Sequence, residues 1–71
     1  MQQIQRKLGD RIRKLRTRKG WSQEQFAAVS GLHRTYIGAV ERGEKNLTLS
    51  TIHTLAKTLD TSIAQLFRGI A

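Results

Sequence analysis

Residues 22–43 read SQEQFAAVSGLHRTYIGAVERG, and this stretch decides the fold. Ser22 followed three residues later by Gln25 is the capping-box pattern that begins a helix. Small and apolar residues follow, and Gly31 can then take the positive φ that ends a helix. The stretch therefore predicts a first helix over 23–30 that ends at a glycine turn.

A second helix is predicted over 33–42, directly after this turn. Ile37 and Val40 lie three residues apart and form its buried stripe, so the polar residues 34–36 fall on other faces. Gly43 closes this helix. Two short helices separated by a glycine turn form a helix-turn-helix unit, whose second helix can enter the major groove of DNA.

Apolar periodicity and capping residues predict three further helices around this unit. One covers about 3–19, and helices over 49–59 and 63–68 follow the pair, the last opened by a cap at Ser62. The apolar stripes of the first and fourth helices are Ile4, Leu8, Ile12 and Leu15, and Ile52, Leu55, Ala56 and Leu59. Connections are short, so residues 1–71 are expected to form one compact all-α domain of five helices.

The charge of the chain indicates a polyanionic partner. The formal net charge is +8, and residues 1–20 hold eight of the thirteen Lys and Arg against one acid, Asp10. Nucleic acid is the first expectation and an anionic membrane surface the second. The apolar stripe of the first helix is narrow and lacks aromatic residues, which argues against membrane binding and against a targeting segment.

Catalysis and metal binding are not expected. The serines stand where caps and turns are predicted, and VSGLH lacks the glycine pattern and the preceding strand of a nucleophile elbow. His33 and His53 are twenty residues apart and there is no cysteine, which makes a poor metal site. The sequence predicts no enzyme, no cofactor, no metal and no small-molecule ligand. The lack of cysteine allows a reducing compartment, and the cytoplasm of a bacterium is the expected location, with a bacterial or phage-encoded protein bound to the nucleoid.

The order of segments SQEQFA, SGLHRTYI and VERGEKNLTLSTIHTLAKTLDTSIAQLF resembles the phage repressor and Cro type of helix-turn-helix protein. The resemblance extends from Ile4 to Phe67 and implies a lambda repressor-like fold. Within that type, RTYI, the small size and the NLTL loop are similar to controller proteins of restriction–modification systems. Other stand-alone repressors share such segments.

The resemblance implies a role for individual residues. Bases would be read by Arg34, Thr35, Tyr36 and Ala39, and phosphates would be held by Gln23, Arg42, Lys45 and Asn46. Arg16 would form a structural ion pair with Glu41. Relatives often present polar side chains where this chain has Gly38 and Ala39, so Arg34 would carry more of the base reading and DNA shape would matter more.

The same residues also have structural interpretations. A guanidinium can bond O6 and N7 of guanine, and a positive charge at a helix start opposes the helix dipole, so Arg34 is interpreted as a base reader. Thr35 either contacts a thymine methyl or a phosphate, or helps to cap the helix. Tyr36 is expected to be half-buried with its hydroxyl available to a phosphate.

These observations predict a sequence-specific, double-stranded DNA-binding transcriptional regulator that acts as a homodimer on a two-fold-related operator. Half-site centres would lie about 34 Å apart. The expected dimer interface consists of Ile63, Leu66, Phe67 and Ile70; alternatively these residues complete the core of the single chain. The rival functions are an antitoxin-like module that binds a partner protein and a membrane-active basic helix.

Overall fold

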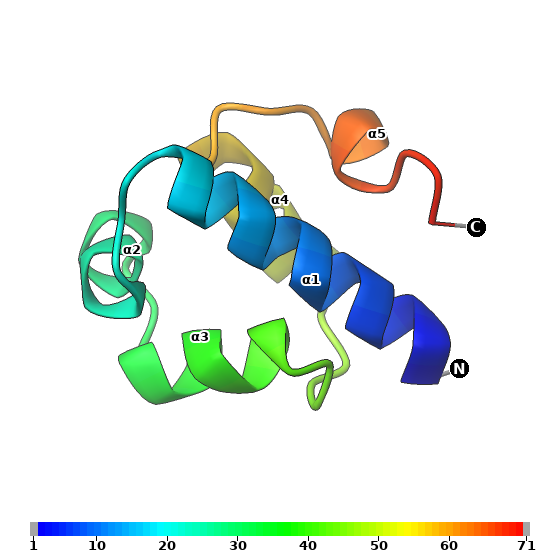
Figure 1. Cartoon of the computed structure of the whole chain (residues 1–71), viewed down its shortest axis with the longest axis horizontal. Coiled ribbons are helices and arrows are strands. Elements are labelled where there is room, and N and C mark those ends of the chain that lie inside the picture. The colour runs from blue at the N-terminus through cyan, green and yellow to red at the C-terminus, as the bar shows by residue number, and fades with distance from the viewer. Residues whose placement is uncertain (1, 71) are drawn as a thin grey trace.

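Five helices and no strand make up residues 2–70, the part of the chain that the computed structural model describes (Figure 1). In chain order they are α1 (Gln2–Arg18), α2 (Gln23–Ser30), α3 (Arg34–Glu41), α4 (Leu49–Thr58) and α5 (Ile63–Leu66). The expected all-α class and the expected number of helices are therefore confirmed.

Local capping bonds begin and end the helices as the sequence predicts. The Ser22 hydroxyl accepts a hydrogen bond from the Gln25 backbone N–H at 3.1 Å, and the Gln25 amide oxygen accepts one from the Ser22 N–H at 2.8 Å. Ser62 opens α5 with the same reciprocal pair. Gly31 ends α2 at φ +77°, where its N–H bonds to a carbonyl one turn earlier, and an L side chain would be strained there.

Four helix ends, in α3, α4 and α5, differ from the prediction. His33 and Arg42 are the caps of α3 rather than members of it, and Leu59 is the C-cap of α4. α5 ends at Leu66, two residues before the predicted end, because the N–H of Phe67 already closes the last turn. The chain then continues as turns. Terminal turns depend on which carbonyls remain free for bonding, and helix periodicity does not specify this.

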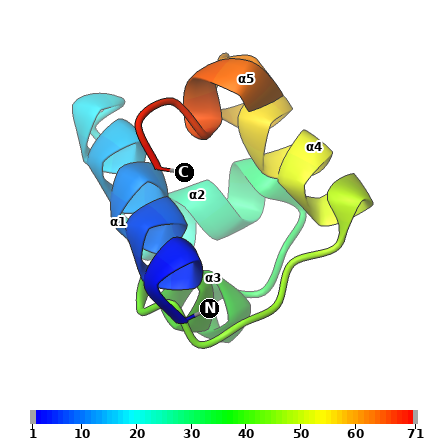
Figure 2. The ribbon, with the colours of Figure 1, turned by 90° about the vertical axis from the view of Figure 1, so that its right-hand side faces the viewer.

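The helices pack around one apolar core. α1 contacts both α3 and α5, while α2 contacts both α3 and α4. Figure 2 shows α1 along one edge of the molecule and α4 on the opposite side. The largest fully buried side chains are Ile12, Phe26, Ile37, Leu55 and Leu66, so every helix contributes one. This packing fixes the α2–α3 unit against α1.

α1 approaches the end of α3 at a glycine. A Cβ atom placed on Gly9 would lie 2.3 Å from the Val40 carbonyl oxygen and 2.8 Å from that of Glu41. Real Cβ atoms do not come so close, so only glycine permits this backbone-to-backbone contact. The contact brings the next turns of α1 within reach of Glu41.

The C-terminal segment contributes more to the core than expected. Leu66 is fully buried and Ile70 exposes only 7% of its surface, so both belong to the core of the single chain. This corrects their assignment to a dimer interface, because side chains already packed inside the chain cannot contact a partner. Phe67 is partly buried against the same core, and Ile63 remains exposed at 38%.

Candidate nucleic-acid interface

The N-terminal end of α3 presents polar side chains to solvent. The side chain of Arg34, the first residue of the helix, is 64% exposed, and Thr35 is exposed beside it. The only ionic neighbour of Arg34 among residues 2–70 is Glu24, which is 3.8 Å away and itself exposed, so this pair is a weak surface contact. The N-cap of α3 is His33, whose side chain accepts no cap hydrogen bond, and Thr35 is the second residue of the helix and not its cap.

Tyr36 lies at the boundary between the exposed end of α3 and the core. It is partly buried and packs against the core cluster, as expected. Its hydroxyl makes no hydrogen bond to any residue in the described range 2–70. The ring therefore anchors the start of α3, and the hydroxyl is available to an external acceptor.

Ala39 does not have the exposure that base reading requires. It exposes 7% of its surface, which leaves its single methyl group too little area to contact a base edge. Gly38 beside it is also buried: a Cβ there would lie 3.2 Å from Nη1 of Arg42 and 3.7 Å from Oε1 of Gln23. The expected base-reading role of Ala39 is corrected accordingly, and the exposed reading surface of α3 is its first turn.

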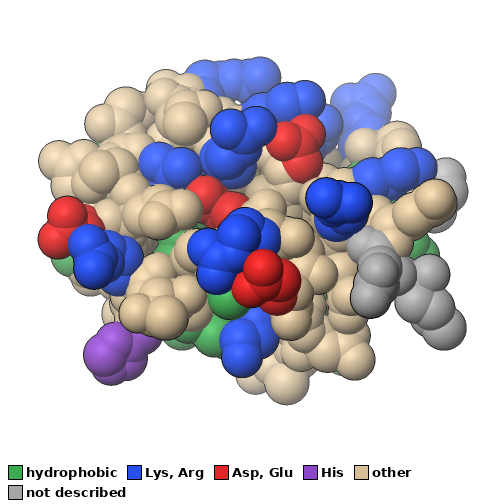
Figure 3. Space-filling model, turned by 60° about the horizontal axis from the view of Figure 1, so that its bottom comes forward, with side chains coloured by type: hydrophobic (Ala, Val, Ile, Leu, Met, Phe, Trp, Pro, Cys, Tyr) green, Lys and Arg blue, Asp and Glu red, His purple; other side chains and the backbone are tan. Residues whose placement is uncertain are grey.

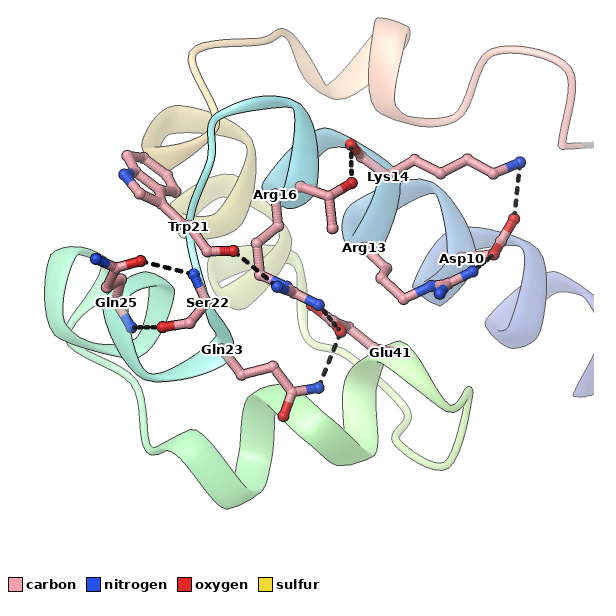
Figure 4. Close-up of polar contacts among 10 residues, drawn as sticks. Asp10, Arg13, Lys14, Arg16, Trp21, Ser22, Gln23, Gln25 and Glu41 are labelled. Carbon is pink, nitrogen blue, oxygen red and sulfur yellow. Dashed lines mark hydrogen bonds and ion pairs between the residues drawn. The ribbon is translucent and has the colours of Figure 1, made fainter.

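A buried carboxylate joins α1, α2 and α3 (Figure 4). Glu41 accepts hydrogen bonds from Arg16 Nε at 2.6 Å, from Arg16 Nη2 at 3.0 Å and from Gln23 Nε2 at 3.0 Å. The Arg16 and Glu41 side chains are only 11% and 3% exposed. Arg16 also donates from Nη1 to the Trp21 carbonyl oxygen at 2.8 Å, which ties the α1–α2 connection to the same group. The two-pronged geometry fixes the angle of α3 relative to α1.

This network gives Gln23 a partner within the protein. Gln23 is half-buried and its amide nitrogen is already bonded to Glu41, so the side chain is oriented by α3 rather than free at the start of α2. A phosphate contact from Gln23 would have to use its backbone N–H, which lies in the unsatisfied first turn of α2, or the second amide hydrogen.

Exposed cations gather around a cleft beside α3, with acidic residues among them (Figure 3). The cleft encloses about 650 Å³ between α1 and the α2–α3 unit. Its charged lining residues are Arg6, Lys7, Asp10, Arg13, Glu41, Arg42 and Glu44. Apart from the buried Glu41, these residues are four cations and two acids, so the cleft has an excess of positive charge.

Two carboxylates neutralise part of this surface. Glu44 accepts two bonds from Arg42, at 2.9 and 3.1 Å, and these bonds hold the pKa of Glu44 below its ordinary value. Hydrogen bonds from Arg13 and then Lys14 lower the pKa of Asp10 in the same way. Both acids consequently stay ionised at neutral pH, and Arg42 uses Nε and Nη2 to bond Glu44.

The loop after α3 carries the remaining expected phosphate contacts. Lys45 and Asn46 are both exposed. The Asn46 side-chain oxygen accepts a hydrogen bond from the Gln5 amide at 2.8 Å, which ties this loop to α1. Lys45 therefore projects from an anchored loop next to the cleft.

Neither a metal centre nor a membrane span appears in the described part of the chain. No three residues with metal-binding side chains cluster within residues 2–70. No helix there is both long enough and apolar enough to cross a bilayer.

Comparison with known proteins gives this arrangement a family. The helix-turn-helix family model matches residues 12–66. Control protein C.SmaI of Serratia marcescens is 56% identical over 59 residues, which are 83% of this chain and 70% of that protein. The chain belongs to the helix-turn-helix family of control proteins. Two structures support this assignment to the control proteins, and the fold resembles them over most of their length.

The first of these structures is the restriction–modification controller protein C.AhdI from Aeromonas hydrophila. It is 52% identical, has a TM-score of 0.83, and the match covers 87% of this chain and 94% of that one. The second is the controller protein C.Esp1396I, solved as a tetramer in complex with its natural 35 base-pair operator. It is 36% identical with a TM-score of 0.83, over 94% of this chain and 88% of that one.

Sequence reasoning missed three features of this control-protein surface. The bond from Gln23 to Glu41 and the approach at Gly9 join residues far apart in sequence, although a glycine inside a predicted helix was a signal for close packing. The Arg42–Glu44 pair had a signal too, because opposite charges stand two residues apart in ERGEK.

Proposed function

We propose that this chain is a sequence-specific, double-stranded DNA-binding transcription regulator of the restriction–modification control type. The observation that carries the proposal is the exposed first turn of α3, with Arg34 and Thr35, held rigidly against α1 and α2 by the Glu41 network. A short helix fixed by its neighbours can be inserted into the major groove with its N-terminal residues against base edges. Arg42, Lys45 and the cations of the cleft then meet phosphates on either side.

The proposal concerns binding without catalysis and without a cofactor. Ser22 and Ser62 are N-cap residues whose hydroxyls accept backbone hydrogen bonds. The buried carboxylate of Glu41 accepts hydrogen bonds from Arg16 and Gln23. Because its target is operator DNA, we place the protein on the nucleoid in the bacterial cytoplasm.

Selection of duplexes from a random library at about 150 mM salt tests the proposal, because non-specific attraction is already weakened there. We expect a two-fold-related motif to be enriched. A folded protein that enriches no motif would contradict specific reading and favour an antitoxin-like partner binder. Helical circular dichroism on the same sample establishes that the protein is folded.

Arg34→Ala is expected to reduce the ratio of specific to non-specific affinity by the equivalent of about 1–3 kcal/mol, the value of one bidentate arginine–guanine contact. Lys45→Ala is the matched control: it should weaken all sequences about equally and reduce the slope of log affinity against log salt by about one. Titration of the selected duplex and of a scrambled duplex measures both effects. Unchanged site preference in Arg34→Ala would show that α3 is not the reader.

We propose that the active form is a homodimer that uses the outer face of α5. Ile63 supports this, since it stays 38% exposed whereas Leu66 and Ile70 are buried. The controller protein C.Esp1396I assembles as a tetramer on its operator, which supports self-association as the mode of binding.

Ile63→Glu is expected to shift the protein toward monomer and to weaken operator binding. The reason is that the substitution would place a charge in the apolar interface between the α5 helices of two protomers. Analytical ultracentrifugation over a concentration series measures the change. The control is Leu49→Glu, at a 78% exposed apolar position on α4, which should leave self-association intact. Equal effects of the two variants would contradict the α5 interface.

A further inference from the structure

A second basic surface runs along the side of α1 that faces away from α3. We define the outer stripe as Arg11, Lys14 and Arg18, which repeat at spacings of three and four and so share one helix face. Gly9 and Arg16 mark the opposite face, because they contact the end of α3. Arg11 is two residues from Gly9 and Lys14 is two residues from Arg16, and two residues correspond to about 200° around the helix.

DNA seated on α3 cannot reach the outer stripe. α1 itself, with a diameter of about 10–12 Å, stands between the stripe and α3. Figure 1 shows α3 below α1 and α5 above it, and Figure 2 shows α1 along an edge of the molecule. The proposed operator complex therefore leaves these cations unused.

The outer stripe also borders a hollow of about 190 Å³ between α1 and the C-terminal turns. Its lining contains the cations Lys7, Arg11, Lys14 and Arg68 and one acid, Asp10, whose carboxylate is already bonded to Arg13 and Lys14. Arg11 donates from Nη2 to the Gln65 carbonyl oxygen at 2.9 Å. Its Nε is the one buried side-chain N or O atom within residues 2–70 that has no hydrogen-bond partner. Four cations around one acid that is already paired make the hollow suited to an oxyanion.

We propose that the outer stripe and this hollow bind the phosphate backbone of a second DNA duplex, so that one protomer holds two duplexes at once. The proposal rests on the proposed function only in taking α3 as the first DNA site. Arg11 to Arg18 span about 10 Å of helix, along which B-DNA presents a phosphate charge about every 1.7 Å. α1 contains no aromatic residue, whereas protein interfaces are enriched in aromatic residues and depleted of lysine at their core. These features favour DNA over an acidic protein.

The test saturates α3 with the selected duplex and then titrates a differently labelled duplex of alternating sequence that lacks the selected motif. The wild-type chain should bind this second duplex. Lys14→Gln/Arg18→Gln/Arg68→Gln should weaken that binding by about tenfold or more through lost counterion release, while affinity for the selected duplex changes by less than about twofold. Arg11 is left intact because it bonds to α5.

The matched control is Arg6→Gln/Arg13→Gln/Lys45→Gln, which removes three cations on the α3 side. It should weaken the selected duplex and leave binding of the second duplex unchanged once α3 is saturated. The proposal is overturned if the wild type binds no second duplex, if both triple variants weaken the selected duplex equally, or if polyglutamate binds the stripe more tightly than the alternating duplex. The two labels separate a failure at α3 from a failure at the stripe.

Discussion

Replacing Glu41 by alanine is expected to lower the free energy of unfolding by about 3–5 kcal/mol. The substitution leaves the Arg16 guanidinium buried without its counterion and removes the acceptor of the Gln23 amide. A buried charge that loses its partner has no compensation for its lost hydration. Urea unfolding followed by circular dichroism measures the change, and the loss is large compared with the total stability of a domain of this size.

Two variants separate the charge effect from a general loss of packing. Arg16→Met/Glu41→Leu removes both charges and should recover most of the lost stability, since apolar replacement of a buried pair is often neutral. Glu44→Ala breaks the exposed pair with Arg42 and should leave the urea midpoint nearly unchanged. If Glu41→Ala were no more destabilising than Glu44→Ala, the buried network would not hold α3 in place.

Gly9→Ala is expected to destabilise the fold by about 3 kcal/mol or more, at the upper end of overpacking effects. An alanine inside a helix ordinarily stabilises it by about 0.5–1 kcal/mol relative to glycine, so the expected effect has the opposite sign. The reason is that the new methyl group would meet the backbone carbonyls of Val40 and Glu41, which belong to the last turn of α3 and cannot rotate away. The shift in thermal midpoint measures the loss.

Gly38→Ala is the control, because Gly38 is also helical and buried. Its new Cβ would lie 3.2 Å from Nη1 of Arg42, which is the end of a flexible side chain. The next neighbour is the Gln23 side-chain amide, at an ordinary contact distance of 3.7 Å. We expect stability close to that of the wild type. A Gly9→Ala variant as stable as Gly38→Ala would mean that α1 and α3 can separate without cost.

The sequence by itself determined the helices and their order. α2 and α5 begin after the N-caps Ser22 and Ser62, each of which forms a capping box with the glutamine three residues later in the sequence. Gly31 ends α2 because glycine readily adopts a positive φ. These interactions act within one turn of the chain, so they can be predicted without knowing the neighbours. The charge-bearing first turn of α3 follows from the same local information, since Ile37 and Val40 fix which face of the helix is buried.

Only the tertiary structure decided how wide each buried face is and which distant groups meet. Leu66, Ile70 and Ala39 are buried, and Ile63 is not, because the crossing of neighbouring helices covers some residues at the edge of an apolar stripe and leaves others exposed. The bond from Gln23 to Glu41 and the contact at Gly9 likewise depend on the angle between α1 and the α2–α3 unit. Periodicity specifies the direction a side chain takes from its own helix, whereas burial and pairing depend on the distance and angle of the next helix.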